Sequence, residues 1–111
     1  MIIINLEAGM PTVEGAMIQL RQSLLSAKAR RVRVIKLIHG YGSTGKGGAI
    51  GAATRRELAK YRQSGAITDY IPGEEFSPFS PNARKALEVE PALRKDTDYT
   101  RSNQGITIVI V

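Results

Sequence analysis

The sequence predicts a two-layer α/β domain, and three observations point to this class. Short runs rich in β-branched residues, at 2–6 and 32–38, flank a segment whose apolar residues recur every three or four positions. A second segment with this helical period follows a glycine-rich loop, and the chain ends on the apolar run ITIVIV. The predicted order is strand, helix, strand, helix, strand, a longer insertion and a final strand.

The first half of the chain predicts a parallel strand pair. Residues 2–6 are typical of a buried strand that ends in a turn, and Pro11 and Thr12 then begin a helix from about 12 to 29. The apolar face of this helix comprises Val13, Ala16, Met17, Leu20, Leu24 and Ala27. Because a second strand follows at 32–38, we expect a right-handed crossover that leaves both strand ends at one edge of the sheet.

The second half contains one more helix and two more strands. The helix after the glycine-rich loop ends at Ser64 and Gly65, and strands are predicted at 67–71 and after Gly105. The apolar stripe of this second helix comprises Ile50, Thr54, Leu58 and Tyr61. The remaining stretch, 74–104, is too long for an ordinary connection.

This insertion at 74–104 is predicted to contain helical structure of its own. Ser80 suits an N-cap and Pro81 the first helical position, so a short helix is expected before Pro91 interrupts it. A further helical turn and then a loop follow.

Length and composition limit the class of protein. With 111 residues the chain can bury a hydrophobic core without a disulfide or metal to stabilise it, so we expect a single domain spanning 1–111. The absence of cysteine excludes disulfides and thiolate metal sites. The apolar N-terminal run is too short for a signal or a membrane-spanning helix, so we expect a cytoplasmic protein without membrane association.

The charge of the chain favours a polyanionic partner. Sixteen Lys and Arg against ten Asp and Glu give a net charge of +6. Clustered cations release condensed counterions when they contact phosphates, so nucleic acid is the expected partner. Aromatic residues make up only 5% of the chain and Trp is absent, which argues against an aromatic base-stacking platform.

The loop HGYGSTGKGG, residues 39–48, nearly matches a phosphate-binding loop of nucleotide hydrolases. The match fails at Gly47, because that position needs a hydroxyl to bind Mg²⁺. Two interpretations remain, a flexible turn and a cradle for backbone phosphates. Its place between a parallel strand and a helix, with Lys46 inside it and Arg55 and Arg56 close behind, favours the cradle.

The stretch VRVIKLIHGYGSTGKGGAIGAATRRELAKY resembles the second half of the small MutS-related (Smr) domain, in which a strand leads to an HGxG loop and a basic helix. The N-terminal strand and long helix, and the closing run GITIVIV, agree with the same family pattern. The resemblance implies a βαβαββ order, a four-stranded mixed sheet and two main helices packed on it. The insertion at 74–104 is longer than the usual final connection of the family.

The resemblance also implies DNA or RNA binding that depends on structure rather than base sequence, and it leaves endonuclease activity open. The nucleic-acid-binding residues we predict are Gly40, Gly42, Ser43, Thr44, Lys46, Arg55, Arg56 and Lys60. The family's second motif, L-D-x-H, falls on residues 4–7, where Asn5 replaces the Asp and Glu7 replaces the His. These replacements weaken the case for cleavage and not the case for binding.

Glu7 and His39 are the candidate catalytic residues, because both follow strands that end at the same edge. A neighbouring carboxylate would raise the pKa of the imidazole and keep it as a cation or general acid. The alternative is a His39 that only bonds within the turn and a solvated Glu7. No metal ligands or cofactor are predicted, except Mg²⁺ or Mn²⁺ if the protein is a nuclease.

Two further hypotheses concern other surfaces. The basic residues in 28–33 should lie at the opposite end of the second strand from the glycine-rich loop, so only one of these regions can centre a small site. Phe76, Phe79 and Tyr99 either form an apolar surface of a protein-interaction module or fill the core. The expected oligomeric state is a monomer or a weak homodimer.

Overall fold

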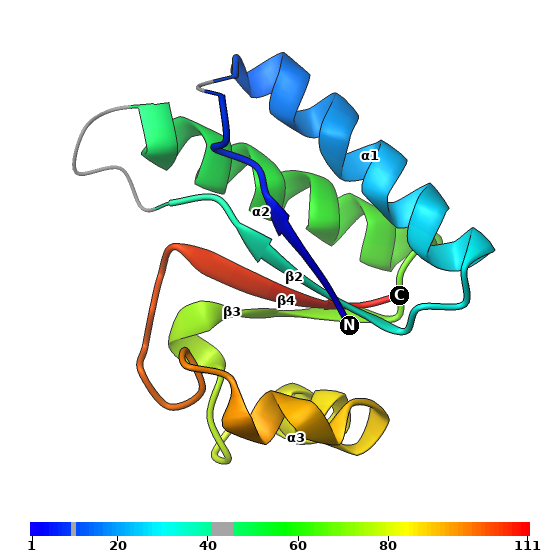
Figure 1. The fold of residues 1–111 in the computed structure, drawn as a ribbon, viewed down its shortest axis with the longest axis vertical. Coiled ribbons are helices and arrows are strands. Elements are labelled where there is room, and N and C mark those ends of the chain that lie inside the picture. The colour runs from blue at the N-terminus through cyan, green and yellow to red at the C-terminus, as the bar shows by residue number, and fades with distance from the viewer. Residues whose placement is uncertain (10, 41–45) are drawn as a thin grey trace.

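The computed structural model describes residues 1–9, 11–40 and 46–111, which form one four-stranded sheet with helices on both faces (Figure 1). The strands are β1 (Ile2–Asn5), β2 (Val34–Ile38), β3 (Asp69–Pro72) and β4 (Ile106–Ile110). The helices are α1 (Val13–Ala29), α2 (Lys46–Ser64), α3 (Pro81–Val89) and the 3-10 helices η1 (Gly73–Glu75) and η2 (Pro91–Lys95).

The sheet is mixed, as predicted, and its strand order is β1-β2-β4-β3. β1 and β2 are parallel, with Asn5 opposite Ile38, so both strands end at the same edge of the sheet. β4 runs antiparallel to β2 on one side and to β3 on the other. The last strand of the chain is therefore central, and all five of its residues are buried.

Helices α1 and α2 cover one face of the sheet (Figure 1). α1 begins where the sequence predicts, because the Thr12 side chain accepts a 3.0 Å hydrogen bond from the backbone N–H of Gly15. α2 ends at Ser64, before Gly65 with a positive φ of 82°. The core on this face includes Leu6, Ala16, Leu20, Leu24, Ala27, Ile35, Leu37, Ile50, Leu58, Ile67 and Val109.

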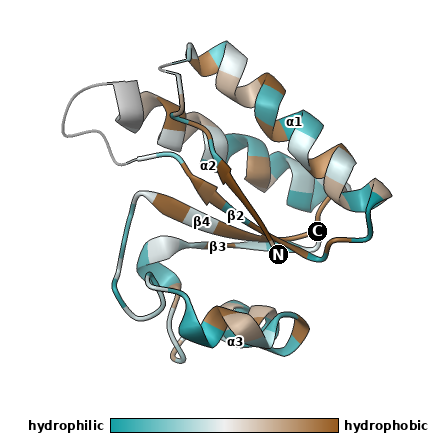
Figure 2. Cartoon of the chain, viewed as in Figure 1, coloured by the Kyte–Doolittle hydropathy of each residue, from teal (hydrophilic) through white to brown (hydrophobic). Residues whose placement is uncertain are grey.

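The 74–104 segment covers the opposite face and adds a layer to the predicted two. Figure 2 shows hydrophobic colour concentrated along β1, β2 and β4, while the helices carry both colours. This second core comprises Val34, Ile71, Phe76, Ala83, Ala86, Leu87, Leu93, Ile106, Ile108 and Ile110. Because both faces of β2 and β4 are covered, these strands are apolar almost without interruption.

The aromatic residues of this segment divide between core and surface. Phe76 is buried at 1% exposure, and its ring centroid lies 5.0 Å from that of Tyr99. Phe79 is 89% exposed. The predicted contact surface of three aromatics is therefore not present, because two of them pack in or against the core.

The prediction of a buried first strand was wrong. β1 lies at the edge of the sheet, next to β2, and Ile3 is 57% exposed. The predicted start of α3 is confirmed, with Ser80 at the N-cap and Pro81 as the first helical residue, although the Ser80 hydroxyl contacts the Asn82 side chain and makes no capping hydrogen bond.

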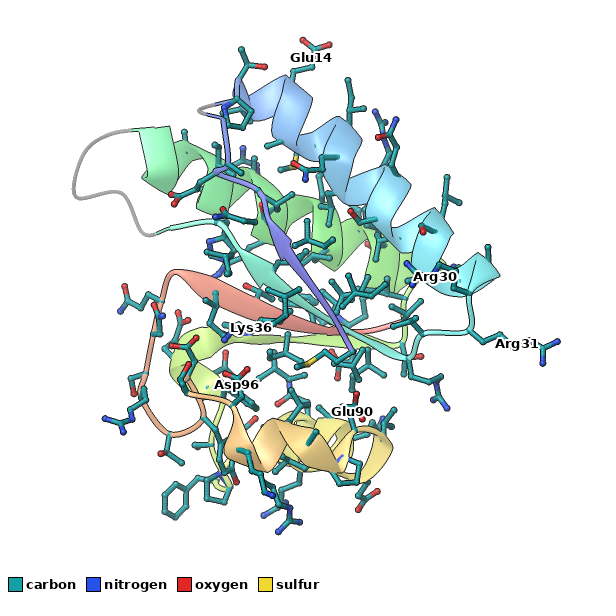
Figure 3. The ribbon with its side chains drawn as sticks, viewed as in Figure 1. Glu14, Arg30, Arg31, Lys36, Glu90 and Asp96 are labelled. Carbon is teal, nitrogen blue, oxygen red and sulfur yellow. The ribbon has the colours of Figure 1, made fainter. Side chains whose placement is uncertain are left out.

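A buried ion group joins the sheet to the 74–104 segment (Figure 3). The Lys36 Nζ lies 2.8 Å from Asp96 Oδ1 and 2.6 Å from Asp98 Oδ2. Burial acts to lower the pKa of Lys36, but the two carboxylates outweigh it and the pKa is raised. Lys36 faces the second core between Val34 and Ile38, where the sequence alone indicated only a strand.

We predict that Lys36→Met lowers the free energy of unfolding by about 3–5 kcal/mol, because it leaves two carboxylates buried without a cation. Asp98→Asn should cost less, since Lys36 keeps Asp96. Urea denaturation measures both effects. The exposed Lys85→Met is the control and should stay within about 0.5 kcal/mol of the unchanged protein. A loss for Lys36→Met no larger than that of the control would contradict the stabilising role.

Candidate functional site

A hollow of about 320 Å³ lies at the edge where β1 and β2 end. It is lined by His39, Gly40, Gly48, Gly51, Ala52, Arg55 and Gln104. These residues come from the end of β2, the first turns of α2 and the connection into β4. The hollow therefore combines the carboxyl edge of a parallel strand pair with the amino-terminal half of a 19-residue helix.

His39 is the most buried polar side chain of this site, at 1% exposure. Its Nδ1 lies 2.9 Å from the Gly40 carbonyl oxygen, and its Nε2 lies 2.8 Å from the Thr107 hydroxyl. A carbonyl can only accept, so we assign the proton to Nδ1, and the Thr107 hydroxyl then donates to Nε2. Both nitrogens of a neutral ring are satisfied in this way.

Burial lowers the pKa of His39, and the charge of Arg55 lowers it further. The Gly40 carbonyl and the charges of Glu7 and Glu74 act in the opposite direction and are outweighed. Glu7 thus acts in the predicted direction, but the predicted net increase of the His39 pKa was wrong. The physical reason is that desolvation of the ring exceeds the Coulombic effect of the carboxylate.

Two glycines allow the close packing around His39. Gly40 has a φ of +72°, and a Cβ there would overlap the carboxylate of Glu7. Glu7 therefore lies against the Gly40 backbone. A Cβ on Gly51 would come within 2.9 Å of both the Gly40 carbonyl oxygen and the His39 Nδ1. Gly51, which we did not predict as a site residue, thus lets α2 approach the end of β2; its one sequence signal is a glycine within a helical period.

Asn5 has a structural role in the turn after β1. Its side-chain oxygen accepts a 2.9 Å hydrogen bond from the backbone N–H of Glu7, which shapes the turn after β1. Glu7 is partly buried beside Gly40, and His39 bonds to other partners. The two candidate catalytic residues are thus neighbours at one edge without a mutual hydrogen bond.

Arg55 is anchored to the 74–104 segment. It donates to both carboxylate oxygens of Glu74, at 2.9 and 2.7 Å, and to the Gln104 carbonyl at 3.0 Å. Its Nε is buried and has no hydrogen-bond partner among the described residues. Burial acts to raise the pKa of Glu74, but the Arg55 hydrogen bonds outweigh it and the pKa is lowered. Arg55 therefore lines the hollow and also ties α2 to Glu74 and Gln104 of the 74–104 segment.

The other predicted cations lie along α2. Arg56 is exposed, and the Lys60 side chain is 73% exposed, 3.6 Å from Glu57. Ala52, Arg56 and Lys60 are four residues apart, so they form one exposed row that starts at the hollow. Lys46 is the first residue of α2. The predicted binding residues Gly42, Ser43 and Thr44 lie outside the described residues.

Potential metal ligands do not converge at the site. In the described part of the chain, no group of three or more His, Asp or Glu side chains is placed to hold a metal ion. Glu7 is the one acidic residue beside Gly40, and Glu74 is occupied by Arg55. The described residues therefore form no preformed cage for Mg²⁺ or Mn²⁺, and an ion at Glu7 would take its other oxygen ligands from water or substrate.

The basic residues at 28–33 lie at the far end of β2 from His39, as predicted. Figure 3 shows Arg30 and Arg31 where α1 ends, with the Arg31 side chain directed away from the body of the molecule. They contribute nothing to the hollow. No helix in the described ranges is long and apolar enough to cross a membrane.

Comparison with solved structures identifies the fold. The Smr domain of Thermus thermophilus MutS2 superposes with a TM-score of 0.60, over 99% of this chain and 96% of that chain, at 19% sequence identity. No protein-family model and no curated protein matches the sequence. The chain has the fold of an Smr domain, which confirms the structural part of the resemblance, and the matched span includes the 74–104 segment.

We predict that stability falls on mild acidification because of His39. The pKa of His39 lies below 6.5 in the folded protein, so the unfolded chain binds its proton at higher pH. The contribution of the neutral ring is complete above about pH 6.5 and is lost as the pH falls toward the folded-state pKa, by at most about 1.4 kcal/mol per pH unit. Urea denaturation between about pH 7.5 and 5.5 measures this loss.

His39→Gln is the control, because His39 is the one histidine of the chain and this slope should disappear with it. Glu74 and Asp98, whose pKa values are lowered, titrate below this window. A ring titration by NMR with its midpoint above 6.5 would contradict the assignment of a neutral, buried His39.

Proposed function

We propose that this protein binds DNA or RNA through backbone phosphates at the edge where β1 and β2 end. The observation that carries the proposal is the hollow at the first turns of α2, continued by the exposed row of Ala52, Arg56 and Lys60. Backbone N–H groups at a helix N-terminus and nearby cations together stabilise phosphate oxygens.

Charge and packing support an anionic ligand in the hollow. The chain carries a net charge of +6, and Arg55 in the wall has a buried Nε without a partner among the described residues. Such a donor is stabilised when an acceptor oxygen reaches it. Three of the lining residues, Gly40, Gly48 and Gly51, are glycines and add no side chain to the hollow.

Contacts of this kind bind the backbone without reading bases. We therefore propose recognition of nucleic-acid structure rather than sequence, as the resemblance to the Smr family implies. The predicted loop residues Gly42, Ser43, Thr44 and Lys46 belong to the same proposal, since they connect the end of β2 to the start of α2.

We predict that Arg56→Ala and Lys60→Ala each weaken binding and flatten its salt dependence. Each lost phosphate contact should reduce the slope of log K against log salt by about 0.9 on duplex and about 0.7 on single strands. Fluorescence anisotropy with a labelled DNA duplex and an RNA hairpin, from about 50 to 200 mM salt, measures both quantities.

Arg31→Ala is the matched control, because Arg31 is an exposed arginine at the other end of the sheet. Its slope should equal that of the unchanged protein. A larger effect for Arg31→Ala than for Arg56→Ala would move the binding surface to the 28–33 cluster. Absence of binding to both probes at low salt would refute the proposed function.

Cleavage of the bound strand is the second candidate, favoured by the carboxylate of Glu7 against the backbone of Gly40. Incubation with supercoiled plasmid and structured RNA, with and without Mg²⁺ or Mn²⁺, tests it by nicking. Because the acidic residues here do not form a metal centre, we expect retention of the plasmid without nicks. Metal-dependent nicks that Glu7→Gln abolishes would instead establish a nuclease.

A further inference from the structure

A second hollow, of about 440 Å³, adjoins the first along the same edge of the sheet. It is lined by Asp98, Arg101, Ser102, Asn103 and Gln104, which belong to the connection between η2 and β4. Gln104 lines both hollows. The two hollows are therefore neighbours on the protein surface.

The turn that forms the second hollow is held in place from several sides. The Asp98 carboxylate bonds to Lys36 in the sheet and accepts a 2.9 Å hydrogen bond from the Asn103 amide. The Asn103 side-chain oxygen accepts a 2.8 Å bond from the backbone N–H of Gly105. The backbone N–H of Thr100 donates to the Phe76 carbonyl at 2.9 Å. The turn is thus tied to the sheet, to β4 and to the second core.

The backbone on either side of Arg101 is strained. Thr100 and Ser102 have φ values of 66° and 52°, a region that residues other than glycine seldom occupy. Such a conformation persists only where the surrounding structure enforces it. The hydrogen bonds of Asp98 and Asn103 supply that enforcement, so the position of Arg101 is defined before a ligand binds.

The charges in this hollow favour an anion at Arg101. Arg101 is exposed and makes no ion pair with a described residue, whereas the Asp98 carboxylate is only 19% exposed and is paired with Lys36. Hydrogen-bonding donors on Ser102, Asn103 and Gln104 lie around the same hollow. A phosphate therefore meets one available cation and several neutral polar groups.

We propose that a nucleic-acid strand held in the first hollow continues into the second, where Arg101 binds a further backbone phosphate. This inference rests on the proposed function and extends its surface from α2 across the sheet edge to the 98–104 turn. Asn103 acts as a positioning residue, because it ties the turn to Gly105 and Asp98.

We predict that Arg101→Ala weakens binding several-fold and lowers the salt slope by about 0.9 on the DNA duplex, the change expected for one phosphate contact. Arg94→Ala is the matched control, since Arg94 is an exposed arginine of η2 that lines neither hollow. Asn103→Ala should weaken binding as well, although it retains every cation. The same anisotropy titrations measure all three variants.

The outcomes separate the two proposals. If the unchanged protein binds no probe at low salt, the proposed function fails and this inference fails with it. If it binds and Arg56→Ala lowers the slope while Arg101→Ala behaves like Arg94→Ala, only the second contact is refuted. Thermal unfolding of Arg101→Ala should match that of the unchanged protein, because the exposed guanidinium makes no ion pair in the described structure.

Discussion

The pairing of β4 with β2 is the interaction on which the rest of this structure depends. β4 lies between β2 and β3, so its side chains contribute to both cores. The same pairing assembles the site, because the Gly105 carbonyl accepts hydrogen bonds from the backbone N–H groups of His39 and Gly40, at 2.9 and 3.0 Å. Thr107 adds the bond to the His39 ring. The candidate site at this edge of the sheet is therefore complete only when β4 has paired with β2.

This arrangement gives His39 a different character from that of an exposed histidine. Its ring is enclosed by Gly51, Gly40 and Thr107, and both nitrogens are bonded. The cost of charging a buried imidazole exceeds the attraction of the nearby carboxylates, so the ring is held neutral. A neutral, fully bonded histidine holds the backbone at the end of β2 in place, which is what the proposed phosphate site requires.

The cations of the chain serve two physical purposes. Lys36 and Arg55 are paired with carboxylates and join the sheet and α2 to the 74–104 segment. Arg56 and Arg101 are exposed near the two hollows. Because paired and partly buried charges are costly to release, the exposed cations are the ones available to a polyanion. The 74–104 segment therefore supplies one core, supports Arg55 and forms the second hollow.

Local sequence determined much of this protein. Hydrophobic period, the Thr12 cap and Gly65 located both long helices, and the strand, helix, strand order placed β1 and β2 in parallel with the glycine-rich loop at their common end. These features depend on residues within a few positions of each other. The sequence alone was therefore enough to locate the candidate site and three of the residues that line it, His39, Gly40 and Arg55.

Only the tertiary structure decided which residues meet there. Lys36 and Asp96 are 60 positions apart, and His39 and Thr107 are 68 apart. No local pattern encodes such pairs, and their protonation depends on burial that exists only after the layers pack. For the same reason the sequence predicted a raised pKa for His39 and a buried β1. Desolvation of the ring and the position of β1 at the edge of the sheet gave the opposite results.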